Sequence, residues 1–374
     1  MMRSPALAAL AIALVVAGCA TTETAPPVPR RLTATEGRAL VDRLLPPHLA
    51  DRAGWATDVH AAFAALDLPD TSQNVCAAIA IAELESGLRG DPQVPGLARI
   101  ARKEIDARRE RAGVPGLMVE TALALPSSNG KSYGERLDAV TTEGQLSELY
   151  EDFIGRVPFG RTLFADRNPV RTGGPMQVSV SFAQAQLEAR PYPYPSADSA
   201  RREVFTRRGG LYFGIAHLLD YRAPYDRYLY RFADFNAGRY ASRNAAFQQA
   251  LTQVSGIPLT PDGALLRVDD GNVSDTPSAT EAAARSVARR LGMQPDGVRG
   301  DLEQGRSEAF ARSTLYTRVF DEAERLSGKR MARAAVPQIV LHSPKITRKL
   351  TTEWFAERVD GRFRQCLQRD RQPR

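Results

Sequence analysis

The sequence predicts a mostly α-helical protein. From Leu32 onward most of the chain shows the spacing of apolar residues that is typical of amphipathic or buried helices. Several of these segments begin and end with capping residues, as at Ser278 and Gly292. Segments of alternating β-branched residues are few, and the best strand candidate is QIVLHS near Ile339. The class is therefore mostly α.

The expected helices run from residue 32 almost to the end of the chain. Those that carry the argument below are expected at 70–90, 210–221 and 225–237. The others are expected at 35–41, 55–66, 97–112, 146–154, 182–187, 244–253, 280–291, 308–326 and 352–368. Residues 259–280, rich in Pro, Gly and Asp, predict a connector before a C-terminal helical region at 281–374.

The composition is that of one globular protein with a large core. Of its 374 residues, 43% are hydrophobic and 25% are charged. The formal net charge is +7, and the basic residues are nearly all arginine. No Lys/Arg run is dense enough for a DNA-binding patch, so we do not expect nucleic acid as a partner. In an exported protein, the cell wall and anionic lipid headgroups are the expected polyanions.

The first nineteen residues predict a bacterial lipoprotein signal. Arg3 supplies the positive charge, Ala6–Val16 is apolar, and small residues precede Cys19. This apolar run is shorter than the ~20 residues of a membrane-spanning helix. We expect residues 1–18 to be removed and Cys19 to carry lipid, with a plain secretory signal and an incidental cysteine as the alternative. Residues 19–31, rich in Thr and Pro, predict an extended tether.

The residue after the cysteine indicates the destination. Ala20 stands at this position, where an aspartate would oppose transfer to the outer membrane. This sorting rule belongs to the lipoprotein signals of Gammaproteobacteria, which this signal resembles. We therefore expect the protein at the outer membrane, lipid-anchored and facing the periplasm.

Two cysteines remain after Cys19. Cys76 and Cys366 form an even pair in an oxidising compartment, which makes them a candidate disulfide. Two separately buried thiols are the alternative. The histidines are scattered singles, so we expect no metal site and no cofactor. They are His48, His60, His217 and His342.

Three short segments carry the candidate chemistry. The first is Glu85-Ser86, at the end of a helix that is apolar or alanine nearly all round and is therefore expected to be buried. At such an end, desolvation and the helix dipole both raise the pKa of a carboxyl group, which suits a general acid. Glu83 is the competing carboxylate. The second segment is the Gly-rich turn at 173–178, and the third is a helix end at 234–238.

In this order the three segments resemble the signatures of the soluble lytic transglycosylase and goose-type lysozyme superfamily. Those signatures are a Glu-Ser after an apolar helix, a Gly-Leu-Met-Gln-Val turn and an Ala-Tyr-Asn-Ala-Gly helix end. Residues 210–221 are similar to the family helix between the last two signatures. The resemblance covers roughly 70–255 and implies a lysozyme-like helical domain at 32–258, with a large helical insertion at about 89–172. The layout is also similar to proteobacterial lipoproteins placed in this superfamily.

The resemblance implies a role for each matching residue. Glu85 would protonate the glycosidic oxygen between N-acetylmuramic acid and N-acetylglucosamine in peptidoglycan. It would then act as base on the 6-hydroxyl, giving a 1,6-anhydro product with no second carboxylate. The residues implied in substrate binding or in orienting Glu85 are Ser86, Gly174, Met176, Gln177 and Asn236. The alternative is a catalytically silent lysozyme-like module that binds glycan or scaffolds envelope proteins, because Phe235 replaces the family tyrosine.

The lipid anchor can be tested at Cys19. Cys19→Ala should leave the protein unlipidated, because the substitution removes the thiol that carries diacylglycerol. Each buried methylene of an acyl chain contributes ~0.8 kcal/mol, so the wild-type anchor is effectively permanent. After high-salt washing, the wild type should remain with membranes and the variant should not. A variant that stays with the membranes would contradict the lipid anchor.

Overall fold

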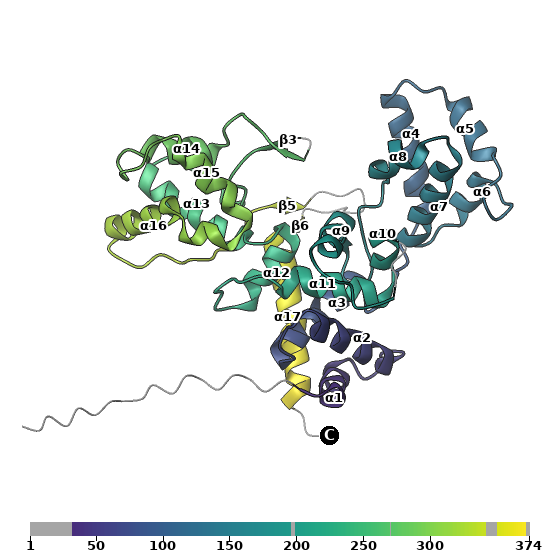
Figure 1. Cartoon of the computed structure of the whole chain (residues 1–374), viewed down its shortest axis with the longest axis horizontal. Coiled ribbons are helices and arrows are strands. Elements are labelled where there is room, and N and C mark those ends of the chain that lie inside the picture. Colours follow the sequence, from purple (N-terminus) through teal and green to yellow (C-terminus); the bar gives the residue numbers. More distant parts are fainter. Residues whose placement is uncertain (1–31, 196–198, 270, 342–349, 372–374) are drawn as a thin grey trace, which may run out of the picture. The chain divides into compact units, whose positions relative to one another are not determined.

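Helices make up nearly all of the regular structure (Figure 1). The computed structural model describes residues 32–195, 199–269, 271–341 and 350–371. Within these ranges it contains 17 α-helices, and its strands form three antiparallel pairs of two residues each. The prediction of a mostly α-helical protein is therefore confirmed. The expected signal peptide and tether, Cys19 and His342 lie outside the described residues.

The first hydrophobic core draws its helices from both ends of the chain. It contains buried residues of α1 (Ala34–Leu44), α2 (Arg52–Ala65), α3 (Ser72–Ser86), α11 (Arg207–Leu219), α12 (Tyr228–Ala237) and α17 (Thr352–Arg371). All residues from Val75 to Ala82 of α3 are buried, as expected for a helix that is apolar nearly all round. Thus the last helix of the chain completes a core that the first helices begin.

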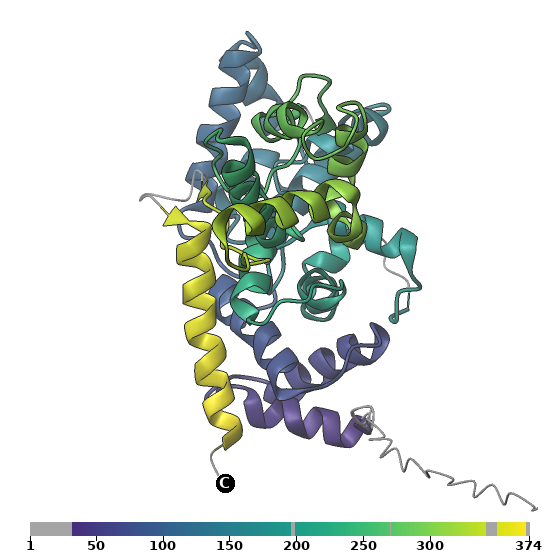
Figure 2. The same ribbon diagram turned by 90° about the vertical axis from the view of Figure 1, so that its left-hand side faces the viewer.

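The last helix, α17, contacts four elements of this core region. It packs along both α3 and α12, and in Figure 2 it runs as one unbroken helix. It also contacts β6 (Leu350–Thr351), which pairs with β5 (Val340–Leu341), and it contacts α1. The strand expected near Ile339 is present as β5.

None of the helices in the described ranges is long and apolar enough to cross a membrane.

The region expected as an insertion has a small core of its own. It contains α4 (Leu97–Arg111), α5 (Gly116–Ala124), α6 (Tyr133–Ala139), α7 (Glu143–Arg156), α8 (Gly160–Phe164) and η1 (Ala165–Arg167). The rings of Tyr133 and Phe153 meet edge to face at 5.1 Å in this core. Capping boxes at Ser132 and Thr142 start α6 and α7. By contrast, α5 has no buried residue.

Short elements connect this region to α11. They are β1 (Thr172–Gly173), β2 (Val178–Ser179), α9 (Val180–Ala189) and α10 (Ala200–Val204). The two strands pair antiparallel, with Gly173 opposite Val178. The Gly-rich segment at 173–178 is therefore the turn of a small hairpin, and this hairpin leads directly into α9.

A further core lies in the C-terminal half of the chain. Its elements are α13 (Ala241–Ser255), β3 (Val268–Asp269), β4 (Asn272–Val273), α14 (Ala279–Val287), α15 (Gly297–Glu303), η2 (Gln304–Arg306), η3 (Glu308–Arg312) and α16 (Thr314–Ser327). The buried face of α13 packs with α14 and α16 in this core. The helix expected at 308–326 begins later than predicted. A 3₁₀ helix occupies its first residues, and Ser313 then caps α16 by accepting from the backbone N–H of Tyr316.

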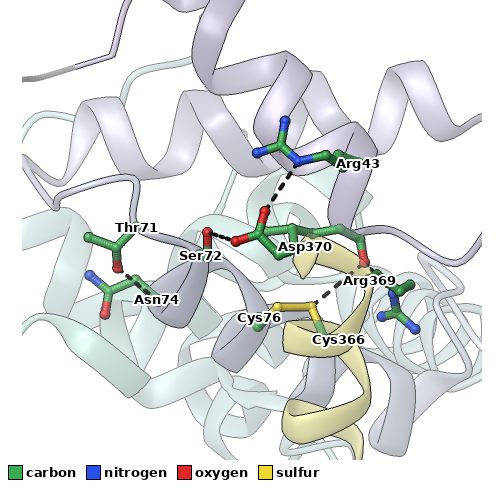
Figure 3. The surroundings of a disulfide bond; sticks show 9 residues. Arg43, Thr71, Ser72, Asn74, Cys76, Cys366, Arg369 and Asp370 are labelled. Atoms are coloured by element: carbon green, nitrogen blue, oxygen red, sulfur yellow. Dashed lines mark hydrogen bonds and ion pairs between the residues drawn. A yellow bond between two sulfur atoms is a disulfide. The ribbon is translucent and has the colours of Figure 1, made fainter. Parts of the chain in front are cut away.

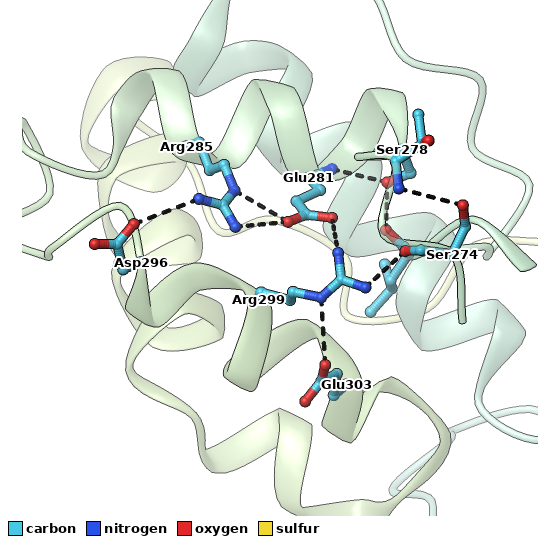
Figure 4. A network of polar contacts seen from close by, with 9 residues as sticks. Ser274, Ser278, Glu281, Arg285, Asp296, Arg299 and Glu303 are labelled. Carbon is cyan, nitrogen blue, oxygen red and sulfur yellow. Dashed lines mark hydrogen bonds and ion pairs between the residues drawn. The ribbon is translucent and has the colours of Figure 1, made fainter. Parts of the chain in front are cut away.

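A buried carboxylate organises this C-terminal core (Figure 4). The Glu281 side chain is 1% exposed. Its Oε1 accepts from Arg285 at 2.8 Å, and its Oε2 accepts from Arg299 at 3.2 Å. Burying a carboxylate is unfavourable unless its oxygens are paired and hydrogen-bonded. The two arginines meet that requirement and connect α14 to α15.

A disulfide joins α3 to α17 (Figure 3). The Cα atoms of Cys76 and Cys366 are 5.5 Å apart, within the range of disulfides in proteins. The pairing predicted from the sequence is therefore present in the structure. One turn before Cys76, Ser72 Oγ donates to Asp370 Oδ2 at 2.6 Å. Arg43 Nε of α1 donates to the other oxygen of Asp370 at 3.2 Å, so polar contacts extend the connection to α1.

Removing the disulfide should destabilise the fold. The bridge joins residues 290 positions apart. Closing so long a loop restricts the unfolded chain, and the chain-entropy model gives an upper value of about 6 kcal/mol for its contribution to the free energy of unfolding. Urea unfolding should show that a reductant lowers the stability of the wild type toward that of a Cys76→Ala/Cys366→Ala variant. The variant should not respond to reductant. A wild type that is equally insensitive would contradict the bridge.

Candidate functional site

The disulfide determines which side of α3 faces α17. Successive residues of an α-helix are ~100° apart around its axis. Glu83 is seven positions after Cys76 and so lies on the same face, toward α17. In agreement, burial lowers the pKa of Arg369 of α17, and the Glu83 carboxylate opposes this effect. Glu85 is nine positions after Cys76, roughly 180° round the axis, and so projects away from α17.

The end of α3 holds Glu85 through its backbone. Glu85 is partly buried. Ser86 Oγ donates to the carbonyl of Ala82 at 2.8 Å and accepts from the backbone N–H of Arg89 at 3.1 Å. Gly87 then adopts the left-handed conformation that ends the helix, with φ of 61°. We expected Ser86 to orient Glu85, but its single proton is used in the helix end, so Ser86 positions Glu85 only through the turn.

The Gly-rich turn is tightly built around Gly174. Its φ is +72°, and a Cβ at this position would lie 2.0 Å from the carbonyl oxygen of Val204, so only glycine fits. Gln177 closes the turn by donating its backbone N–H to the Gly174 carbonyl at 3.2 Å. Its side-chain Nε2 donates to the same carbonyl at 3.4 Å, and its Oε1 accepts from Thr172 at 3.3 Å. The Gln177 amide is thus engaged inside its own hairpin.

Met176 packs between the Gly-rich turn and α11. Its side chain is fully buried, and its sulfur would lie 2.5 Å from a Cβ on Gly214 of α11. The absence of a side chain at Gly214 therefore lets the hairpin pack closely on α11. The resemblance implied that Met176 contacts the substrate, but none of its surface is exposed, so it does not form such a contact in this structure.

Asn236 lies at the end of α12 and is exposed. Its Oδ1 accepts from the hydroxyl of Thr352, the first residue of α17, at 2.8 Å. This contact engages only the amide oxygen of Asn236. Its N–H₂ group can therefore donate to a ligand. In this way α17 restrains α12 near Asn236 and α3 at the disulfide.

Asp234 is a buried carboxylate that sequence reasoning did not single out. Its Oδ2 accepts from the hydroxyls of Tyr221 and Tyr225 at 3.1 and 2.8 Å. The backbone N–H groups of Tyr240 and Ser242, at the start of α13, donate to the same carboxylate at 2.9 and 2.6 Å. Burial raises the pKa of Asp234, and these hydrogen bonds oppose the effect. Its contacts make it a structural link between α12 and α13.

The third segment and α9, the helix that follows the second segment, meet around His217, near the end of α11. His217 Nε2 lies 3.3 Å from the carbonyl oxygen of Phe235, to which it donates when it carries the proton. The rings of Phe182 and Phe235 contact the imidazole edge to face, with centroids 4.8 and 5.0 Å away. Arg239 lies over the Phe182 ring and donates to the His217 carbonyl at 3.1 Å. No sequence pattern indicated this cluster, since its members come from three elements.

All three segments are positioned by one helix. α11 contacts α3, β2 and α12, which carry or directly adjoin Glu85, Gln177 and Asn236. The resemblance placed 210–221 between the last two segments, and the structure has α11 there. Glu85 and Gln177 are 92 positions apart along the chain, and Gln177 and Asn236 are 59 positions apart. Only tertiary packing therefore brings the elements that hold them into contact with α11.

Unusual backbone conformations accompany the three segments. Six non-glycine residues of the described chain have positive φ. Three of them are Leu88, Gln177 and Tyr240, each within four positions of Glu85, Gln177 or Asn236. Each such residue costs on the order of 1–3 kcal/mol, and such conformations cluster at functional sites. Their distribution supports the choice of these segments as the candidate site.

Two cavities were found away from Glu85. One, of about 480 Å³, lies beside α1 and the start of α3. The other, of about 170 Å³, lies between α4 and α5. Neither is lined by Glu85, Gln177 or Asn236. Among the residues that the structure describes, no group of three or more His, Cys, Asp or Glu side chains could hold a metal ion.

These features define a mostly helical protein in which a disulfide-linked core gathers three motif segments around one helix. Residues 48–369 match the family described as "Protein of unknown function (DUF1615)", and the chain belongs to this family. It is similar to the "Uncharacterized protein YaiW" of Escherichia coli (strain K12), with 48% identity over 354 residues and 95% of each chain covered. No solved structure matches the chain.

The partly buried His217 should make stability depend on pH. Burial, reinforced by the positive charge of Arg239, lowers its pKa from 6.5 to about 4. Its contribution to stability is therefore complete above pH 6.5 and is lost as pH falls toward 4. This linkage alone should lower the free energy of unfolding by about 2 kcal/mol between pH 7 and pH 5.

The matched variant is His217→Gln, whose amide can still donate to the Phe235 carbonyl but does not titrate. Chemical unfolding at both pH values should show the wild type losing about 2 kcal/mol more than the variant. Equal losses in the two proteins would contradict the assignment of this pH dependence to His217.

Proposed function

We propose that this protein is a lipid-anchored peptidoglycan lytic transglycosylase at the periplasmic face of the outer membrane. Glu85 would be its single acid and base. The observation that carries the proposal is the packing of α3, β2 and α12 against α11, because it gives three sequence signatures a common structural support. Catalytic residues are often brought together from segments that are distant in the sequence.

The position of Glu85 suits a general acid. It lies in the last turn of a helix whose residues 75–82 are all buried, near the end at which the helix dipole is negative. Its direction away from α17 leaves it outside the disulfide-linked face of α3. Glu85 would protonate the glycosidic oxygen between N-acetylmuramic acid and N-acetylglucosamine, and then remove the proton of the 6-hydroxyl as the 1,6-anhydro bond forms.

The other signature residues would have unequal roles. The Asn236 amide retains its N–H₂ donors, which suit a sugar hydroxyl or N-acetyl carbonyl. Gln177 would have to exchange its contact with Thr172 for one with the substrate. Gly174 lets the hairpin approach its neighbours closely, and Met176 holds the hairpin on α11. These two would act through the shape of the turn.

A catalytically silent glycan-binding or scaffold lipoprotein is the second candidate. Two observations favour it. The amides of Gln177 and Asn236 both accept hydrogen bonds from within the protein. Phe235 also lacks the hydroxyl of the tyrosine found at this place in the resembling superfamily. A module of this kind would bind sacculi and release no product.

The deciding experiment compares two carboxylates of one helix. Purified sacculi are incubated with the wild type, Glu85→Gln and Glu83→Gln, and the soluble muropeptides are analysed by mass spectrometry. Glu85→Gln should lower the release of 1,6-anhydro products by about 10²- to 10⁴-fold, because an amide cannot donate the acid proton. Glu83→Gln should retain activity, since Glu83 faces α17.

Three other outcomes each have a definite meaning. Loss of activity in Glu83→Gln alone would show that Glu83, and not Glu85, is the catalytic acid. Reducing-end products without the anhydro bond would indicate hydrolysis. If the wild type sediments with sacculi but releases nothing, the enzymatic proposal fails and the binding module is supported.

A further inference from the structure

An exposed apolar surface lies where α7 turns into α8. Val157, Phe159 and Leu163 are 38%, 82% and 61% exposed. Phe159 is the N-cap of α8, and the backbone N–H of Leu163 donates to its carbonyl oxygen at 3.0 Å, so the two residues lie one turn apart. We call these three residues, together with the four arginines of residues 154–171, the α8 surface. Scattered apolar residues are ordinary on protein surfaces, but three large ones within seven positions form a local patch.

The backbone presents Phe159 outward at an energetic cost. Its φ is 57°, in the left-handed region that bulky side chains rarely adopt. The next residue, Gly160, packs so closely that a Cβ would lie 2.1 Å from the Ile154 carbonyl oxygen. The tight turn at Gly160 thus places the aromatic ring in solvent. Both the backbone strain and the exposed ring are unfavourable for the isolated fold. Burial of the Phe159 ring against a bound partner would offset this unfavourable free energy.

The charge around this patch is strongly positive. Residues 154–171 contain four arginines and one acidic residue, Asp166. All four arginines are exposed, and no carboxylate pairs with them among the described residues. They are Arg156, Arg161, Arg167 and Arg171. The other exposed apolar segment of this region, at Leu117 and Met118 of α5, differs because the preceding Arg108 and Arg109 are paired with acidic side chains.

We propose that the α8 surface docks onto an anionic phospholipid bilayer. Aromatic and aliphatic side chains that enter the interface, surrounded by arginines that bind lipid phosphates, are the chemistry of interfacial membrane binding. The docking would orient the domain at the membrane and is independent of any catalysis by Glu85.

Vesicle sedimentation tests the docking without the lipid anchor. The protein starts at residue 19 and carries Cys19→Ala, which leaves the compact unit of residues 32–374 intact. It should sediment with vesicles of phosphatidylethanolamine and phosphatidylglycerol (3:1) and bind phosphatidylcholine vesicles much less. Phe159→Ser and Leu163→Ser should each lower the partition coefficient roughly tenfold. Arg156→Gln and Arg161→Gln should each lower it roughly fivefold at low salt.

Two matched controls separate binding from folding. Leu326→Ser removes a leucine that is 52% exposed, next to Arg325, which is paired with Glu322, and it should leave vesicle binding unchanged. Phe159→Gly relieves the positive φ, so its Tm should equal or exceed that of the wild type while its vesicle binding falls as in Phe159→Ser. A loss of binding with a higher Tm cannot come from unfolding.

Three results would overturn the proposal. The first is equal binding of the wild type and the α8 variants to anionic vesicles, or equal binding of the wild type to neutral and anionic vesicles. The second is binding to purified sacculi that these variants lose, with no vesicle binding, which would make the surface a cell-wall contact. The third is self-association in sedimentation velocity that the variants abolish, which would make it an interface between copies.

Discussion

The bridge between Cys76 and Cys366 is the constraint on which the geometry of the candidate site depends. A helix that is buried on every side, such as α3, has little in its own apolar pattern to determine its rotation about its axis. The covalent bond removes that freedom by holding one face of α3 against α17. Once this face is set, helical geometry directs Glu83 toward α17 and Glu85 away from it. The same helix α17 begins at Thr352, which contacts Asn236.

The sequence was informative wherever local chemistry decides the structure. Apolar periodicity and capping residues predicted the helical class, because these patterns act within one or two turns. The even cysteine count after Cys19, together with an expected oxidising compartment, predicted the pairing that joins α3 to α17. The Gly-rich segment was also recognised as a turn, since Gly174 needs a conformation open to glycine.

The sequence was much less informative about contacts between distant segments. Ser86 and Met176 were assigned roles at the substrate, whereas the structure uses one in a helix end and buries the other on α11. Both differences depend on neighbours that no local pattern specifies. The His217 cluster was not predicted for the same reason, because its rings come from α9, α11 and α12. The α5 helix, in which no residue is fully buried, was not predicted.

The return of α17 to the first core has a consequence for the order of events during biogenesis. The region of α4 to α8 and the region of α13 to α16 each bury residues that are close in sequence, so each can form soon after its own residues have been synthesised. The core of α1, α2, α3, α11 and α12 cannot be completed until the twenty residues of α17 are present. Cys76 therefore remains a free thiol until Cys366, on α17, is available to form the bridge.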